Sequence, residues 1–222
     1  MNNRIESFYA RYLKRITDIF CAISAILVFS WLYVIIAILV WKKLGRPVIF
    51  KQERPGRINP KTNKEVLFNL YKFRSMNNAT DIEGKLLPDS ERLTKFGEIL
   101  RATSLDELPE VWNILKGDLS IVGPRPLAVQ YLPYYTDEER RRHIVRPGLT
   151  GLAQVNGRNG LQWEERFAYD LYYVDNISFA NDIKIILLTI KKVLKREDVS
   201  VRGTGKTVDF DKYRQNGEKY DD

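Results

Sequence analysis

The longest apolar stretch of the chain constrains its fold more than any other feature. No charged residue occurs from Phe20 to Trp41. As an α-helix, these 22 residues would extend over about 30 Å, the thickness of the hydrocarbon core of a bilayer. A secretory signal peptide would be shorter and would end at a small-residue cleavage site. The stretch therefore predicts a membrane-embedded helix, and a buried core helix is the alternative.

Basic residues flank this stretch on both sides. They are Arg11, Lys14 and Arg15 before it, and Lys42, Lys43 and Arg46 after it. Because basic flanks favour the cytoplasmic side, a helix that returns to the face it entered satisfies both flanks, whereas a spanning helix satisfies one. The hydroxyl of Ser30, at the middle, can bond to a carbonyl one turn earlier and bend the helix. We expect a re-entrant helix that breaks at Ser30, with a simple span as the alternative.

The net charge of +8 is concentrated in the first part of the chain. Residues 1–57 carry ten Lys and Arg against three acids, a net +7, which leaves +1 for residues 58–222. This asymmetry suits an anionic membrane surface and argues against a nucleic-acid partner. Cys21 and His143 are the single cysteine and histidine, so an internal disulfide, a cysteine-based zinc site and multi-histidine chemistry are excluded.

The remaining sequence predicts an α+β fold. Two β-rich runs, 47–52 and 66–73, enclose a turn rich in Pro, Gly and Asn and predict a β-hairpin. Helical patterns follow at 90–101, 105–116, 126–132, 161–174 and 177–197. The last is amphipathic and fits either the membrane interface or the protein core. We expect a membrane-embedded segment (1–45), a mostly helical catalytic domain (46–200) and a flexible tail (201–222).

Two adjacent acids, Asp106 and Glu107, are the first candidates for chemistry. Ser104 and Glu107 have the spacing of a capping box, which predicts a helix that begins here. A helix N-terminus favours the carboxylate anion, so we expect a lowered pKa for Asp106. An ionised carboxylate can act as a nucleophile or hold a metal. Helix capping and chemistry are compatible roles, and Pro109 leaves the start of the helix open.

Basic residues in constrained or Gly-rich segments are the second set of candidates. Arg125 stands between two prolines, which restrict the backbone and suit a guanidinium aimed at a phosphate; an exposed arginine in a rigid loop is the alternative. Lys72 and Arg74 end the second β-rich run. The segment 146–159 is Gly-rich and basic but lacks the P-loop spacing, so it could contact a nucleotide without being an ATPase loop. Asp170 and Asp175 are expected to be solvated helix acids.

Together these segments resemble the bacterial sugar transferase family, the monotopic phosphoglycosyl transferases. The resemblance extends from about residue 12 to 199. Its motifs occur in this order: KRITDIF, the apolar stretch, VIFKQERPG, YKFRSM, TSLDELPEVWNILKGDLSIVGPRPL, RPGLTGLAQVNGR and DLYYVDNISF. The spacing is closest to that of small members without additional membrane helices. Such proteins start protein N-glycosylation, exopolysaccharide or capsule synthesis.

The resemblance implies a reaction and a site. Asp106 would be the nucleophile on the phosphate that carries the sugar, and Mg²⁺ would be held by Asp106 and Glu107. Arg125 would contact the substrate phosphate, with Lys72, Arg101 and Arg158 as further basic substrate-binding residues. Together with Lys72, Arg101 and Arg158, these residues make up the implied site.

The resemblance also implies partners and a location. The donor would be a UDP-sugar, the acceptor undecaprenyl phosphate, and the product UMP. The enzyme would lie in the bacterial inner membrane with its catalytic domain on the cytoplasmic face, and it could form a homodimer. The family bends its membrane helix at a Ser-Pro pair, whereas here Trp31 follows Ser30. A non-catalytic membrane scaffold is the competing hypothesis, and it predicts indifference to the acidic pair.

Overall fold

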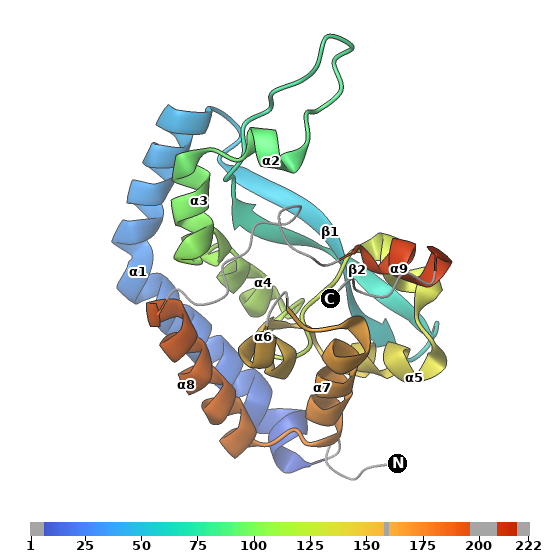
Figure 1. The fold of residues 1–222 in the computed structure, drawn as a ribbon. Helices are drawn as coiled ribbons and strands as arrows, with labels where there is room; N and C mark the ends of the chain where they lie inside the picture. The colour runs from blue at the N-terminus through green and yellow to red at the C-terminus, as the bar shows by residue number, and fades with distance from the viewer. Residues whose placement is uncertain (1–6, 158–159, 196–207, 217–222) are drawn as a thin grey trace.

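The computed structural model describes residues 7–157, 160–195 and 208–216 (Figure 1). Its helices and strands, in chain order, are η1 (Tyr9–Leu13), α1 (Lys14–Leu44), β1 (Ile49–Asn59), β2 (Lys64–Phe73), α2 (Asp89–Arg92), α3 (Lys95–Ala102), η2 (Leu105–Glu107), α4 (Glu110–Lys116), β3 (Ser120–Val122), η3 (Val129–Tyr134), α5 (Asp137–Arg140), η4 (Arg141–Ile144), β4 (Gly148–Thr150), α6 (Leu152–Gly157), α7 (Trp163–Asp175), α8 (Phe179–Lys195) and α9 (Phe210–Asn216). This is a mixed helix and sheet architecture, as predicted.

The apolar stretch forms most of α1, which lies along one side of the molecule (Figure 1). The helical region Tyr9–Leu44 is long and apolar enough to cross a membrane, and only 11% of its most apolar stretch is buried inside the protein. Ala22, Ile36 and Val40 form its inner stripe and pack on the rest of the chain. The opposite face leaves large side chains such as Phe20, Leu27 and Trp31 exposed. The alternative of a buried core helix is therefore wrong.

The expected break at Ser30 does not interrupt the helix. Helix α1 continues from Lys14 to Leu44. The Ser30 hydroxyl does donate to the carbonyl of Leu27, at 3.1 Å, as the sequence predicted. A serine bonded in this way keeps the helical backbone, and Trp31 retains the N–H that a proline would lack. The helical assignment is therefore continuous through Ser30, and both a bend at Ser30 and the re-entrant topology remain predictions.

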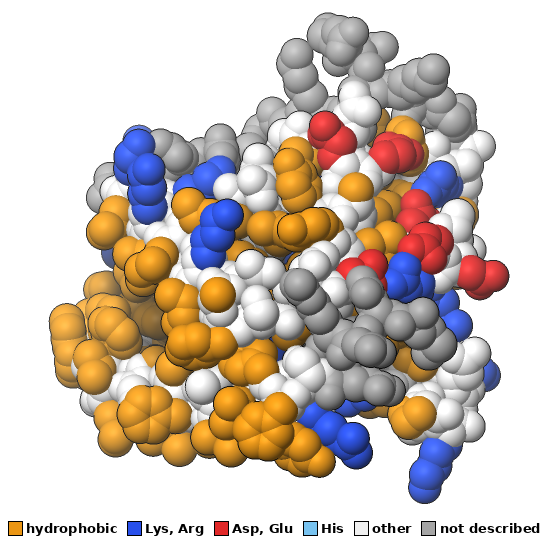
Figure 2. Space-filling view, turned by 90° about the horizontal axis from the view of Figure 1, so that it is seen from below, with side chains coloured by type: hydrophobic (Ala, Val, Ile, Leu, Met, Phe, Trp, Pro, Cys, Tyr) orange, Lys and Arg blue, Asp and Glu red, His pale blue; other side chains and the backbone are white. Residues whose placement is uncertain are grey.

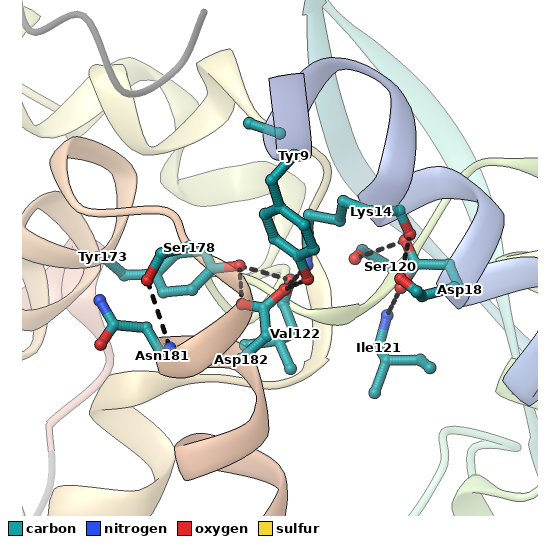
Figure 3. A network of polar contacts seen from close by, with 12 residues as sticks. Tyr9, Lys14, Asp18, Ser120, Ile121, Val122, Tyr173, Ser178, Asn181 and Asp182 are labelled. Atoms are coloured by element: carbon teal, nitrogen blue, oxygen red, sulfur yellow. Dashed lines mark hydrogen bonds and ion pairs between the residues drawn. The ribbon is translucent and has the colours of Figure 1, made fainter. Parts of the chain in front are cut away.

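Buried polar contacts fasten the start of α1 to the rest of the protein (Figure 3). The Asp18 carboxylate accepts hydrogen bonds from the hydroxyl of Ser120 at 2.7 Å and the backbone N–H of Ile121 at 3.0 Å. Asp182, at the beginning of α8, pairs with Lys14 at 2.6 Å. It also accepts hydrogen bonds from the hydroxyls of Tyr9 at 2.6 Å and Tyr173 at 2.8 Å. Because these groups are satisfied only when α1 and α8 are docked, they specify how the apolar helix meets the domain.

The predicted hairpin is present, and its strands are longer than expected. β1 pairs with β2 in antiparallel register from Ile49 opposite Phe73 to Asn59 opposite Lys64, with an irregularity between Pro55 and Ile58. Much of the segment predicted as a turn is therefore strand. At Gly56 a Cβ atom would lie 2.8 Å from the carbonyl oxygen of Val66, so a glycine permits this close pairing. The short parallel pair of β3 and β4 was not predicted.

The last amphipathic pattern forms α8, with a stripe of exposed apolar side chains. Phe179, Ile183, Leu187, Ile190 and Leu194 recur at helical spacing and are 40–78% exposed. Ile185 and Asp182 face the interior instead. Hydrophobic side chains gather on the side of the molecule where α1 and α8 lie, whereas acidic side chains gather on the other side (Figures 1 and 2). This exposed stripe of α8 is thus not used in the core, whereas Ile185 is.

The prediction of a flexible tail is wrong for residues 208–216. These residues include α9, and the Phe210 side chain is fully buried. It packs with Tyr131, Trp163 and Phe167 in one hydrophobic cluster. The polar composition of the segment concealed one large aromatic anchor, whose burial stabilises the docked helix. The remaining tail residues lie outside the described residues.

Candidate active site

One cavity of about 610 Å³ brings most of the predicted site residues together. Its walls include Lys72, Arg101, Asp106, Glu107 and Arg125. Lys72 comes from the end of β2, Arg101 from α3, the two acids from η2, and Arg125 from the loop after β3. Residues separated by more than 50 positions in sequence therefore meet at one site. Arg158 lies outside the described residues.

Glu107 forms the ionic centre of this cavity. Its Oε1 atom lies 2.7 Å from the Lys72 Nζ and 2.9 Å from the Arg125 Nη2. Burial works to raise the pKa of Glu107, but Lys72 and Arg125 outweigh it and hold that pKa well below its usual range. Glu107 is therefore anionic at neutral pH, and it orients both basic side chains toward the cavity.

Asp106 differs from its neighbour, since no described residue forms a hydrogen bond or ion pair with its carboxylate. Its residue is 7% exposed and lines the cavity. Burial, followed by the charge of Glu107, raises the pKa of Asp106 to about 6, while Lys72, Arg101 and Arg125 oppose this rise. A carboxylate of raised pKa is more basic, yet it is still largely ionised at neutral pH. Asp106 is thus the member of the pair whose carboxylate is not engaged by any described residue.

The backbone around the pair corrects the predicted cap. Ser104 adopts a φ of 55°, its side chain forms no capping bond, and only a single 3₁₀ turn follows, at Leu105–Glu107. Helix α4 begins at Glu110, after Pro109. A continuous helix would require residue 109 to donate an N–H to the Leu105 carbonyl, and proline has none. The predicted capping box and the lowered pKa of Asp106 are therefore wrong.

A third acid, Glu110, was not recognised from the sequence as part of the site. It is 2% exposed, lines the cavity and lies 3.1 Å from the Lys72 Nζ. Burial raises the pKa of Glu110 to about 7, and the attraction of Lys72 limits the rise. Lys72 is thus shared between Glu107 and Glu110. The sequence feature that could have indicated Glu110 is its position three residues after the acidic pair, in the same motif.

The other predicted basic residues have different roles. The Arg101 Nε donates to the hydroxyl of Ser75 at 2.9 Å and leaves its charge near Asp106 without a direct ion pair. Arg74 is 5% exposed, and its guanidinium donates to the carbonyls of Leu44 and Arg46 at the end of α1. Both arginines line the cavity, and Arg74 in addition caps the C-terminal end of α1.

The buried ion pair of Arg142 and Asp170 supports the backbone of Arg125. The Arg142 guanidinium donates to the Arg125 carbonyl at 2.7 Å and to the Asp170 carboxylate at 2.7 and 3.0 Å. Arg142 and Asp170 are 1% and 2% exposed. The prediction that Asp170 is solvated is wrong, because its partner lies on η4, 28 positions away. Asp175, also expected to be solvated, is partly buried and pairs with Arg141 at 2.5 Å.

The acidic pair offers few ligands for a metal ion. Within the described residues, no group of three or more His, Cys, Asp or Glu side chains is placed to hold one. Asp106 and the Glu107 Oε2 atom remain without a basic partner in that part of the chain. Mg²⁺ commonly takes one or two carboxylates and completes its shell with water and substrate phosphate oxygens. These two side chains therefore fit a magnesium ion that binds together with a phosphate substrate.

Comparisons with known proteins identify relatives of this chain. The family model of the bacterial sugar transferases matches residues 9–196. The uncharacterized sugar transferase EpsL of Bacillus subtilis is 50% identical over 187 residues, which cover 84% of this chain and 90% of that protein.

Longer relatives match over part of their length. The undecaprenyl-phosphate galactose phosphotransferase of Salmonella typhimurium is 37% identical, and the match covers 89% of this chain and 44% of that protein. The UDP-glucose:undecaprenyl-phosphate glucose-1-phosphate transferase of Xanthomonas campestris is 40% identical, with 82% and 38% covered. This chain thus spans less than half the length of these two relatives. From the extent of the family match, the protein belongs to the bacterial sugar transferase family.

Proposed function

We propose that this protein transfers a sugar 1-phosphate from a UDP-sugar to undecaprenyl phosphate and releases UMP, as the first step of a bacterial glycan assembly. Two relatives are named for such transfers to undecaprenyl phosphate, and one of these names specifies a UDP-sugar. The observation that carries the proposal is the contrast within the acidic pair. Glu107 takes the ion pairs with Lys72 and Arg125, whereas Asp106 lines the same cavity and pairs with none of the described basic residues.

In the first step, a carboxylate oxygen of Asp106 attacks the phosphorus that carries the sugar. The bond from that phosphorus to the bridging oxygen breaks, and the electron pair leaves with UMP. The product is an aspartyl phosphosugar. Lys72 and Arg125 lie where they can offset charge on the phosphate oxygens during this displacement.

In the second step, an oxygen of undecaprenyl phosphate attacks the same phosphorus. The bond to Asp106 breaks, and the carboxylate is regenerated with its electron pair. Two displacements at one phosphorus allow the nucleotide to leave before the lipid enters, so one basic cavity can serve both substrates. Mg²⁺ held by Asp106 and Glu107 would supply further neutralisation of the pyrophosphate charge.

The apolar surface formed by α1 and α8 supports a membrane location for the acceptor. The exposed stripe of α8 and the outer face of α1 lie on one side of the molecule (Figure 2). Large exposed apolar surfaces of this kind bind lipid or protein. We propose that this side enters the cytoplasmic leaflet of the inner membrane and that α1 re-enters that leaflet.

The decisive experiment uses purified full-length protein, a radiolabelled panel of UDP-sugars and undecaprenyl phosphate. Asp106→Asn should reduce transfer by roughly 10³-fold or more while the thermal unfolding temperature stays within a few degrees of that of the wild type. The nucleotide product should be UMP. Near-normal turnover by the variant would remove Asp106 from the nucleophile role, and UDP as the product would indicate a different class of transferase.

The topology proposal has its own test. Single cysteines introduced near the N-terminus and after Asp222, in a Cys21→Ser background, should react with a membrane-impermeant thiol reagent from the same side of the membrane. Labelling from opposite sides would show that α1 spans the bilayer.

A further inference from the structure

Helix α9 lies beyond the part of the chain that matches the family, yet it belongs to the core of this protein. The family match ends at residue 196, and α9 begins at Phe210. The Phe210 side chain is 0% exposed. Just before the helix, the carbonyl of Val208 accepts a hydrogen bond from the Trp163 Nε1 at 3.0 Å. The segment is therefore docked by an apolar anchor and by a hydrogen bond.

The Phe210 ring contacts both of the rings that hold Arg142. Its centroid lies 5.3 Å from that of Tyr135 and 5.1 Å from that of Phe167. The Arg142 Cζ atom lies 5.8 and 5.7 Å from the centroids of these same two rings, and its Nη1 donates to the Tyr135 hydroxyl at 3.3 Å. Because the interior is close-packed, the position of Phe210 limits where the two rings, and with them the guanidinium, can lie.

Arg142 connects this packing to the active site. Its Nη2 donates to the carbonyl of Arg125 at 2.7 Å, and the Arg125 side chain pairs with Glu107 at 2.9 Å. The Asp170 carboxylate neutralises the charge of Arg142 at 2.7 Å, while the aromatic rings restrict its direction. A guanidinium that is 1% exposed cannot turn to solvent for other partners. A displacement of Arg142 would therefore alter the backbone position of Arg125.

A second contact joins α9 to the segment that carries Arg142. Arg214, on α9, pairs with Glu139 on α5. Helix α5 ends at Arg140 and is followed directly by η4, which contains Arg142. The Arg214 Cζ atom also lies 5.1 Å from the centroid of the Phe210 ring. The apolar and the ionic contacts of α9 therefore act on the same short stretch of chain.

We propose that α9 is a positioning element of the active site and that Phe210 is its central residue. Phe210 holds the rings of Tyr135 and Phe167 against Arg142. Arg142 in turn fixes the backbone of Arg125, the residue assigned to the substrate phosphate. This inference rests on the proposed function. A shift of about 1 Å in a group that acts on the transferring phosphate is enough to slow the reaction, so a helix that carries none of the chemistry affects kcat.

The test compares kcat and KM of full-length variants with a UDP-sugar and undecaprenyl phosphate. Phe210→Leu should lower kcat by roughly 5- to 10-fold, because the ring that supports Tyr135 and Phe167 is lost. The KM for the UDP-sugar should change by less than about twofold, since the effect is on the transition state. In an Arg125→Ala background, Phe210→Leu should have almost no further effect on kcat. Arg214→Gln, which removes the ion pair but keeps the buried ring, should lower kcat by a smaller factor.

Phe68→Leu is the matched control, because it makes the same change at another buried phenylalanine. Phe68 is 8% exposed, packs with Leu70 and Ile114 in a different hydrophobic cluster, and does not line the cavity of the acidic pair. Phe68→Leu should lower the unfolding temperature, as Phe210→Leu does, while its kcat stays within about twofold of that of the wild type.

Three results would overturn the inference. The first is an unchanged kcat in Phe210→Leu. The second is an equal loss of kcat in Phe68→Leu, which would reduce the role of Phe210 to general stability. The third is a loss that multiplies with that of Arg125→Ala. If Phe210→Leu does not fold, Arg214→Gln and its combination with Arg125→Ala decide in the same way. Absence of sugar-phosphate transfer by the wild type would instead refute the proposed function.

Discussion

Two parts of the cavity wall differ in how they are built. In the first, the reactive part, Lys72, Glu107 and Arg125 form a chain of ion pairs with separations of 2.7 and 2.9 Å. In the second, the aromatic part, Tyr131 and Trp163 line the cavity and pack with the buried ring of Phe210. The reactive part lies wholly within the family match, whereas the aromatic part depends on a residue beyond it. The ion pairs and the packing that completes the cavity wall therefore come from different segments of the chain.

The reactive part also brings several charges close together. Three carboxylates, Asp106, Glu107 and Glu110, share the charges of Lys72 and Arg125, and two of these acids, Asp106 and Glu110, are buried. The pKa of Glu107 is lowered, whereas the pKa values of Asp106 and Glu110 are raised to about 6 and about 7. Such divergence among neighbouring acids is typical of functional sites, since it gives each acid a different protonation behaviour.

The largest effect that would sharpen this comparison is expected at Arg125. Arg125→Ala should reduce kcat/KM by about 10²- to 10³-fold, because a guanidinium aimed at the transferring phosphate is lost. The ratio of kcat/KM among UDP-sugars should not change, since the aromatic part of the wall is intact. A changed ratio would mean that the reactive and aromatic parts are not separate in the choice of donor.

A smaller effect is expected at Asp170, which acts through Arg142 on the backbone of Arg125. Asp170→Asn should lower kcat by roughly 10-fold by loosening the position of that arginine. In an Arg125→Ala background the same substitution should have almost no further effect on kcat. Asp182→Asn, which alters another buried acid away from the cavity, serves as the control and should combine additively with Arg125→Ala. Additivity for Asp170→Asn would reduce its role to general stability.

The smallest effect is expected on the pH dependence of stability, through Glu110 in the reactive part of the cavity. The pKa of Glu110 is raised to about 7, so the folded state retains its proton at a higher pH than the unfolded state does. The contribution of Glu110 to stability is therefore greatest below its ordinary pKa and is lost as the pH rises through about 7. Glu110→Gln should reduce this loss by an amount on the order of 1–3 kcal/mol.

The measurement is the unfolding temperature of both proteins in detergent between pH 5 and pH 8. The unfolding temperature of the wild type should fall more steeply with rising pH than that of Glu110→Gln. Parallel curves of unfolding temperature against pH would show that Glu110 does not have a raised pKa. They would also weaken the electrostatic contrast between the reactive and aromatic parts of the cavity.

Sequence motifs predicted the members of the site better than their surroundings. Lys72, Arg101, Asp106, Glu107 and Arg125 do line one cavity. The cap at Ser104 was wrong because the pattern of side chains gave no weight to the N–H that Pro109 lacks. The solvated state of Asp170 was wrong because a helix pattern does not reveal an arginine on another element.

The sequence by itself determined the apolar helix, the asymmetric charge and the residues of the transfer motif, because these depend on residue type, order and spacing along the chain. Only the tertiary structure decided that Glu107 is paired while no described residue pairs with Asp106, and that Asp209 lines the same cavity. The physical reason is that burial and the distances between charges arise from packing of segments remote in sequence. A local pattern places a carboxylate on the chain, whereas its partners determine its chemistry.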